Sequence, residues 1–288
     1  MFKFYDFVHN HPTLKQFKVD ELLFTAYDCP IEVERLDYWT QKNYFVYTVR
    51  GNLKWKTPTY EYIIGEGDGV FVKKGAHRAY KVLDGDFCAL LIFMPDEFIK
   101  TVIRTHLPEM QNKQNSSATD AIIPLELDDI LSTYFFSVLN YFPQPSPPPK
   151  SLLKIKFEEL IINILTGPKN HLLANYFKEL CCDQKRSIKT TMEENFAYNL
   201  KLAEYAELCG RSIAAFKRDF VKIYRTTPGR WLKARRLEYG KFLLETTDMN
   251  INEITLEIGF ENTSHFIKAF KETYNYPPLH YKKLLQTI

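Results

Sequence analysis

Long hydrophobic runs are absent from the sequence, because no window of its 288 residues reaches the ~18 consecutive apolar residues that span a bilayer. The first residues also lack the basic start and apolar stretch of a secretory signal. Cysteine is scarce, with five residues and no C-x-x-C pair, which disfavours a disulfide framework or a structural zinc site. We therefore expect a cytoplasmic protein without membrane contact, metal or other cofactor.

Catalytic signatures are missing as well. The chain contains no nucleophile elbow, phosphate-binding loop or dinucleotide fingerprint. What it does contain is an ordinary globular composition, with 45% hydrophobic, 15% aromatic and 25% charged residues, in a length that fits two domains. These features favour a folded, two-domain protein that is not an enzyme.

The net charge of +3 is the sum of two unlike parts. Residues 184–288 hold 18 Lys and Arg against 12 Asp and Glu, whereas residues 1–183 hold 20 against 23. A basic C-terminal third indicates an anionic partner, such as nucleic acid, for that part alone.

The first part of the chain shows the pattern of an all-β fold. Short β-prone runs, punctuated by turns at 51–52, 65–67 and 84–86, occupy 32–36, 45–49, 60–64, 70–72 and 87–93. This spacing predicts a sandwich or barrel. The polar stretch 108–120 is expected to be a loop.

Helical periodicity begins near residue 126. Apolar residues from Leu127 to Val138 follow helical spacing, five prolines between 143 and 149 end that helix, and a second helix follows to about 165. We expect an antiparallel helix pair. The polar stretch 183–191 is the predicted linker, which gives domains of residues 1–183 and 184–288.

The C-terminal domain contains an approximate duplication of a helix-turn-helix pattern. In the first copy, a short helix ends at Gly210, which tolerates a left-handed conformation, and Ser212 can cap the next helix. In the second copy, Asn250 and Glu253 have capping-box spacing, Gly259 makes the turn, and the second helix is expected over 261–271.

The second helix of a DNA-reading helix-turn-helix enters the major groove, so its outward residues are the candidate readers. By helical spacing these residues are Ala214, Lys217 and Arg218 in the first copy and Thr263, Ser264 and Lys268 in the second. Arginine and lysine donate to guanine, the hydroxyl side chains contact bases or phosphates, and Ala214 reads at most a thymine methyl group.

A predicted helix over 229–245 joins the two copies. Its ~17 residues span ~26 Å, comparable to the ~34 Å of one DNA turn, so it could place both reading helices in successive major grooves. Lys233, Arg235, Arg236 and Lys241 make it basic enough to lie beside phosphates. The alternative interpretation is a plain helical bundle with a solvated charged face.

Residues 190–285 resemble the AraC/XylS family of bacterial transcription regulators. The resemblance rests on Arg218, Phe220, Thr227-Pro228, Arg236-Leu237, Leu243-Leu244, 248–251, Ile254, Gly259-Phe260, His265-Phe266, 269–271, Pro278 and Tyr281. It implies two helix-turn-helix units that bind promoter DNA. Thr255 and Lys201 depart from the family, which usually has a small alanine and a Ser or Thr cap at these positions.

The N-terminal part resembles, more loosely, the cupin-like sensor and dimerisation domain of this family. The stretch 67–77 carries its glycine, strand, turn and histidine pattern, and the helix around 154–160, with Trp231, looks like the branch of type III secretion activators. The resemblance implies a homodimer made by the helix pair at 126–165, and transcription activation in contact with RNA polymerase.

Other candidate sites have plainer interpretations. His77 occupies the place of a cupin metal ligand, but 38–43 supplies no further histidine, so we interpret it as structural. Trp39, Tyr44, Tyr47, Trp55 and Tyr60 could line a pocket for a small-molecule effector or form the core. His9 and His11 have metal-like spacing but suit a solvated terminus, and Cys181-Cys182 fits a buried helix end better than an oxidation sensor.

The combined hypothesis is an α+β protein, with an N-terminal cupin-like β-barrel and helical dimerisation pair, and a C-terminal all-α domain with two helix-turn-helix motifs. It is expected to bind specific DNA and activate transcription. The alternatives are a small-molecule-binding cupin protein or enzyme with an accessory helical domain, and a module that binds another regulator.

Overall fold

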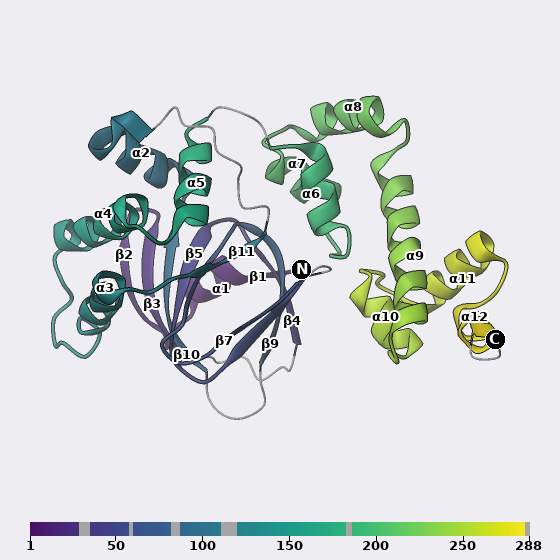
Figure 1. Ribbon diagram of the computed structural model, residues 1–288, viewed down its shortest axis with the longest axis horizontal. Coiled ribbons are helices and arrows are strands. Elements are labelled where there is room, and N and C mark those ends of the chain that lie inside the picture. The colour runs from purple at the N-terminus through teal and green to yellow at the C-terminus, as the bar shows by residue number, and fades with distance from the viewer. Residues whose placement is uncertain (29–34, 58–59, 82–86, 111–119, 183–185, 286–288) are drawn as a thin grey trace. The chain divides into compact units, whose positions relative to one another are not determined.

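The protein has two structural units, Phe2–Gln184 and Lys185–Ile288, in a computed structural model that describes residues 1–28, 35–57, 60–81, 87–110, 120–182 and 186–285. The first unit is mixed α and β and the second is helical, which confirms the predicted α+β class (Figure 1). Parts of three predictions lie outside the described residues: most of the strand at 32–36, the turn at 84–86 and most of the loop at 108–120.

Two sheets form the centre of the first unit. The five-stranded sheet has the order β1 (Phe2–Lys3), β4 (Arg35–Thr40), β9 (Gly75–Lys81), β6 (Leu53–Lys56), β7 (Glu61–Ile64). The six-stranded sheet has the order β11 (Ile122–Leu125), β8 (Gly69–Val72), β5 (Asn43–Arg50), β10 (Cys88–Met94), β3 (Leu22–Asp28), β2 (Lys15–Val19). All described strand pairs are antiparallel except β1 with β4.

The predicted barrel is not closed. No strand pair joins the two sheets among the described residues, so the architecture is that of a sandwich. The five-stranded sheet ends in the two-residue β1 and the four-residue β7. Edges this short offer few backbone groups for pairing with the edge strands of the other sheet.

Alternation along the central strand β10 separates two cores. Leu91 and Phe93 point between the sheets, where they pack with Tyr44, Val46 and other buried residues. Leu90 and Ile92 point to the opposite face of the six-stranded sheet, where a second buried cluster contains residues from four helices. The six-stranded sheet is therefore buried on both faces, as its nearly continuous apolar sequence requires.

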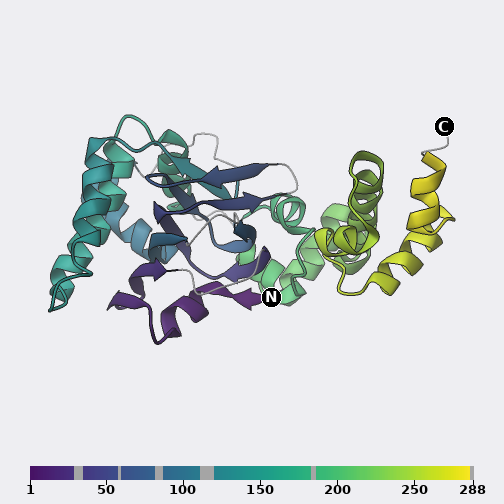
Figure 2. The same cartoon turned by 90° about the horizontal axis from the view of Figure 1, so that it is seen from below.

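Four helices cover that outer face: α2 (Asp96–His106), α3 (Asp129–Leu139), α4 (Lys150–Thr166) and α5 (His171–Leu180). In Figure 2 the blue and teal helices lie together along one side of the sheets. The predicted helix pair corresponds to α3 and α4. The helices α1 (Phe4–Asn10) and α2 were not predicted, because both lie within or beside strongly β-prone sequence.

The second unit contains seven helices among its described residues. They are α6 (Ile188–Asn195), α7 (Leu202–Leu208), α8 (Ile213–Tyr224), α9 (Pro228–Thr246), α10 (Ile251–Glu257), α11 (Thr263–Tyr274) and α12 (Pro278–Leu285). The two units divide between Gln184 and Lys185, inside the predicted linker 183–191, but helix α6 begins within that stretch and shortens it. The Ser187 side chain accepts a hydrogen bond from the Thr190 amide at 3.4 Å and so caps this helix in a polar sequence.

Candidate nucleic-acid interface

Helices α7 and α8 form the first predicted helix-turn-helix. Gly210 takes a left-handed φ of 61°, and the Ser212 hydroxyl accepts from the Ala215 amide at 3.3 Å, as the sequence predicted. Four apolar residues hold the helices together and are buried: Ala206, Leu208, Phe216 and Phe220. The packed face fixes which side of α8 remains exposed.

Helices α10 and α11 form the second helix-turn-helix. Gly259 has a φ of 78°, and a Cβ atom there would lie 2.7 Å from the Ala197 carbonyl oxygen, so only glycine fits. The reading helix begins at Thr263, two residues later than expected, because the Asn262 side chain accepts from the Ser264 amide at 2.7 Å and ends the turn.

The first helices of the two motifs are capped unequally. Asn250 Oδ1 accepts from the Glu253 amide at 3.0 Å, and Glu253 Oε2 accepts from the Asn250 amide at 2.7 Å, which completes a capping box. At the matching place in the first motif, Glu204 accepts from the Lys201 amide at 2.6 Å. Lysine has no acceptor, so only half of the box exists there.

Thr255, the other departure from the family pattern, is buried within the second motif. Its hydroxyl donates to the Ile251 carbonyl at 2.7 Å, inside the same helix. The polar group is thereby satisfied without a partner on another helix, which explains how threonine replaces a small alanine at this position.

On α8 the three predicted readers are exposed on one face: Ala214, Lys217 and Arg218. The Arg218 side chain is 66% exposed and its Nε lies 3.4 Å from Asp219 Oδ1. Asp219 also lies 3.5 Å from the Arg211 guanidinium, so its carboxylate is shared between two arginines. Such an exposed, shared ion pair is weak, which leaves the Arg218 guanidinium available for an anionic partner.

On α11 two of the three predicted readers, Ser264 and Lys268, are exposed. Thr263 is half-buried and its hydroxyl donates to Asn252 Oδ1 at 3.1 Å, so this side chain also links α11 to α10. Lys271, which was not among the predicted readers, is also exposed and continues the face of Ser264 and Lys268 at i, i+4, i+7 spacing. That spacing alone would have identified it.

The joining helix α9 has 19 residues and is slightly longer than predicted, about 28 Å at 1.5 Å per residue. The four basic residues that the sequence singled out each have a partner within the unit. Lys233 pairs with Glu272 at 3.3 Å, Lys241 with Glu245 at 3.8 Å, and Arg235 with Glu193 and Glu238 at 3.1 and 2.8 Å. Because these pairs are largely exposed and therefore weak, the expectation that this helix lies beside phosphates stays a prediction.

Arg236 has a structural role in the same helix. Its guanidinium donates to the Phe196 and Tyr198 carbonyls, both at 2.7 Å, and so ties the segment after α6 to α9. Next to it, Tyr205 donates to the Asn195 carbonyl at 2.8 Å, and burial raises the pKa of this phenol to about 12. These bonds fix the base of the first motif.

Close contact between α9 and the second motif depends on Gly240. A Cβ atom at this position would lie 3.1 Å from Ile258 Cδ1 and 3.2 Å from the Phe266 ring. The glycine lets α9 approach the end of α10 and the reading helix α11, so α9 packs closely against the second motif.

His77 is buried, as a structural histidine should be. Its Nε2 lies 2.7 Å from the Lys73 carbonyl oxygen and its ring packs 5.3 Å from Tyr38. Among the described residues, no group of three or more His, Cys, Asp or Glu could hold a metal ion. His9 and His11 instead bond locally, to Asn10 and Thr13.

The candidate pocket aromatics do not line one cavity. Tyr44 and Trp55 lie in the core between the sheets, Tyr47 lies in the core under the helices, Trp39 is buried and Tyr60 is exposed. The hydroxyls of Tyr38 and Tyr44 are 2.6 Å apart, and Trp55 Nε1 donates to Tyr38 at 2.8 Å. This network satisfies the buried polar groups internally.

Burial raises the pKa of several described cysteine thiols. Cys181 and Cys182 are half-buried at the end of α5, and burial raises the pKa of Cys181. Burial and the neighbouring Asp28 carboxylate likewise raise the pKa of Cys88. A raised pKa keeps a thiol protonated and unreactive. Cys29 lies outside the described residues.

No helix in the described part of the chain has the length and apolar character to cross a membrane. Each of the two units matches a model of a known protein family. Residues 43–176 match the ExsA N-terminal regulatory domain, and residues 205–284 match a helix-turn-helix domain that includes α8 to α11. The domain organisation is therefore that of a helix-turn-helix transcription regulator with an N-terminal regulatory domain.

Relatives extend this match over most of the chain. The virulence regulon transcriptional activator VirF of Yersinia enterocolitica is 24% identical over 80% of this chain and 85% of its own length. The thermoregulatory protein LcrF of Yersinia pestis is 25% identical, also over 80% of this chain and 85% of its own length. The regulator ExsA of Pseudomonas aeruginosa is 22% identical over 78% of this chain and 89% of its own length. Together, these matches confirm the resemblance to the AraC/XylS family of transcription regulators seen in the sequence.

Proposed function

We propose that this protein binds specific promoter DNA with α8 and α11 and activates transcription there. The observation that carries the proposal is the repeated construction of the two motifs. Each has a left-handed glycine, a side-chain cap, and a reading helix that buries two phenylalanines while it exposes a basic and polar face. The relatives VirF and ExsA, named as an activator and a regulator of transcription, support the same function.

The assignment of roles follows from the exposed face of each helix. Arg218, Lys217 and Ala214 are the proposed readers in the first motif, and Lys268 and Ser264 in the second. Thr263 combines a contact to DNA with its link to Asn252. Arginine and lysine on such a face donate to guanine O6 and N7, whereas short polar residues contact bases or phosphates.

The proposed active form is a homodimer made through the helices α3 and α4, in the cytoplasm, where it recruits RNA polymerase. The match of residues 43–176 to the ExsA N-terminal regulatory domain supports membership of the branch that activates type III secretion genes. A small-molecule effector is not required by this proposal, because the candidate pocket aromatics pack into two cores and an exposed strand end. The proposal also assigns the protein no catalytic activity.

Genome-wide mapping of bound DNA tests the proposal directly. The wild-type protein should enrich a small set of promoters that share one sequence motif, and Arg218→Glu and Lys268→Glu should each abolish that enrichment. Lys189→Glu is the matched control, because it makes the same change of charge on an exposed residue of α6, outside both motifs. The proposal would be overturned if Arg218→Glu and Lys268→Glu enriched the same promoters as strongly as the wild type does. Wild-type binding to DNA sites that share no sequence motif would also overturn it.

A further inference from the structure

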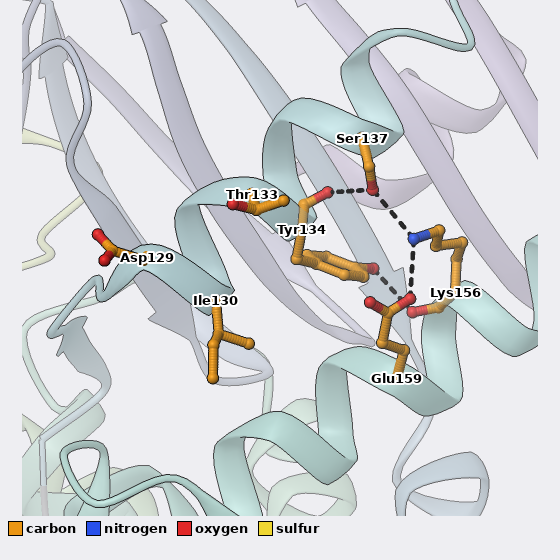
Figure 3. Close-up of a pocket in the computed structure, with 7 residues that line it drawn as sticks. All are labelled: Asp129, Ile130, Thr133, Tyr134, Ser137, Lys156 and Glu159. Carbon is orange, nitrogen blue, oxygen red and sulfur yellow. Dashed lines mark hydrogen bonds and ion pairs between the residues drawn. The ribbon is translucent and has the colours of Figure 1, made fainter.

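Two surface cations of this protein are paired to different extents. Between α3 and α4, beside a hollow of about 410 Å³, the Lys156 ammonium donates to Ser137 at 3.0 Å and to Glu159 at 2.8 Å (Figure 3). Arg218 on α8 is engaged through one nitrogen atom, because its Nε donates to Asp219 Oδ1 at 3.4 Å. Among the described residues, no hydrogen bond or ion pair engages its two Nη atoms. Arg218 is therefore held at one edge of its guanidinium and open at the other.

The open edge of Arg218 is the edge that can read a guanine. A guanidinium is planar, and its five N–H donors have fixed directions. The Asp219 carboxylate takes the side edge, where Nε lies, so one N–H of each Nη atom remains free at the end of the side chain. Two parallel donors of this kind match the O6 and N7 acceptors of guanine, which is the commonest specific contact of arginine in the major groove.

A second arginine holds the Asp219 carboxylate in place. Asp219 Oδ2 lies 3.5 Å from Nε of Arg211, whose side chain is only 15% exposed. One Nη atom of Arg211 donates to the backbone carbonyls of Arg186 and Cys209, both at 2.8 Å. These carbonyls belong to segments that precede α8. The contacts from Arg211 to Asp219 and on to Arg218 therefore fix the reading side chain relative to the turn of the motif.

The second motif has no carboxylate at the matching position. Arg218 and Lys268 each lie six residues after the residue that caps their helix (212 to 218 and 262 to 268), but Lys268 is followed by the buried Ala269. A lysine ammonium is a compact charge with three rotatable donors, so a neighbouring carboxylate would not orient it. A carboxylate on a helix that enters DNA also repels the phosphates. Its presence beside the arginine indicates that orientation offsets this repulsion.

We propose that Asp219 is a positioning residue of the first motif, which holds the Nε edge of Arg218 so that the two Nη atoms donate together to O6 and N7 of one guanine. This inference rests on the proposed function, because it specifies how one of the proposed readers is oriented. The pair is weak while it is exposed to water, but it strengthens when the groove excludes water. An arginine that is already held in its bound conformation also loses less conformational entropy on binding.

Exchange of the contacted base gives the test, in the full-length protein and on the promoter site that the mapping of bound DNA identifies. The guanine in question is the one at which Arg218→Ala no longer distinguishes a G·C pair from an A·T pair. Fluorescence anisotropy gives the Kd for the site, for the site with A·T at this position, and for the site with 7-deazaguanine, which lacks the N7 acceptor. The wild type should bind the unaltered site at least about tenfold more tightly than the A·T site, and also more tightly than the 7-deazaguanine site.

Removal of the carboxylate should abolish most of this discrimination. Asp219→Ala should reduce both preferences to less than about threefold, because the freed arginine no longer presents two donors together. Alanine favours a helix, so the variant should fold, which thermal unfolding checks, and Asp219→Ser should give the same loss. Asp248→Ala is the matched control, because it also removes an exposed carboxylate from the second unit, and it should keep both preferences. In the Arg218→Ala background, Asp219→Ala should change the preferences no further.

Two other roles for Asp219 predict different results. If the carboxylate only repelled phosphates, its removal would tighten binding to all three duplexes by the same factor and leave both preferences unchanged. If it only stabilised the motif through Arg211, its removal would lower the Tm and weaken binding to all three by the same factor. Either result would overturn the positioning role while the proposed function stands. A wild type whose preference depends on Arg218 at no G·C pair would overturn this inference together with the assignment of Arg218 as a reader.

Discussion

Two arginines of the second unit show that the residue type alone does not determine what a side chain does. Arg236 and Arg218 both lie on basic helices of the second unit. Arg236 is half-buried and donates to two backbone carbonyls, while Arg218 is mostly exposed with only a shared carboxylate nearby. The sequence predicts a DNA-reading role for Arg218 from its position on the reading helix, whereas the structure adds a structural role for Arg236 that the sequence did not indicate.

Arg218→Ala should weaken binding to the specific DNA site by about 1–3 kcal/mol, because a guanine contact is lost while the fold is not touched. Fluorescence anisotropy with a labelled promoter fragment measures this change. Lys189→Ala removes one charge outside both motifs and should have a much smaller effect. An unchanged affinity of the Arg218 variant would remove it from the readers.

Arg236→Ala should lower the free energy of unfolding by about 2–4 kcal/mol, because two charge-assisted hydrogen bonds to backbone carbonyls disappear together. The matched control is Arg235→Ala, which removes exposed ion pairs to Glu193 and Glu238 and should cost less than about 1 kcal/mol. Urea unfolding of both variants distinguishes the two cases. Similar losses for the two arginines would contradict the structural role of Arg236.

At the scale of helices and strands, short-range sequence signals predicted some elements correctly, whereas others depend on tertiary contacts. The capping residues and glycines of both helix-turn-helix motifs were visible in the sequence, because they act within a few residues. The helices α1 and α2 were missed, since their apolar residues continue the pattern of the neighbouring strands. The linker is shorter than predicted because Ser187 and the buried Ile188 start α6 within a polar stretch.

The half capping box of α7 gives a prediction at this scale. Lys201→Ser should raise the free energy of unfolding by about 0.5–1 kcal/mol, because a serine hydroxyl can accept the amide hydrogen bond that lysine leaves unmade. Asn250→Ala removes the corresponding acceptor from α10 and should cost about 1 kcal/mol. Thermal unfolding checks both. A Lys201→Ser variant no more stable than the wild type would show that the amide is already satisfied by water.

For the whole molecule, the uneven charge distribution leads to a prediction about salt. If the basic unit neutralises about six phosphates, DNA affinity should fall by about 10³-fold between 50 and 200 mM salt. A titration of the full-length protein with promoter DNA measures the slope of log Kd against log salt concentration. A flat response would count against phosphate contact altogether. The same titration of an N-terminal charge variant, Lys15→Glu, should give an unchanged slope, because the acidic unit is not expected to touch DNA.

The sequence by itself determined the change from β-structure to helices along the chain and the paired helix-turn-helix motifs, because capping, turns and periodicity are local. The readers on α8 and α11 stay predictions. The sequence also indicated α3 and α4 as a helix pair. Only the tertiary structure decided that the sheets form an open sandwich, that the basic residues of α9 hold their own unit together, and that the candidate pocket aromatics separate into two cores. Those outcomes depend on which residues meet across the fold, and one-dimensional patterns do not contain that information.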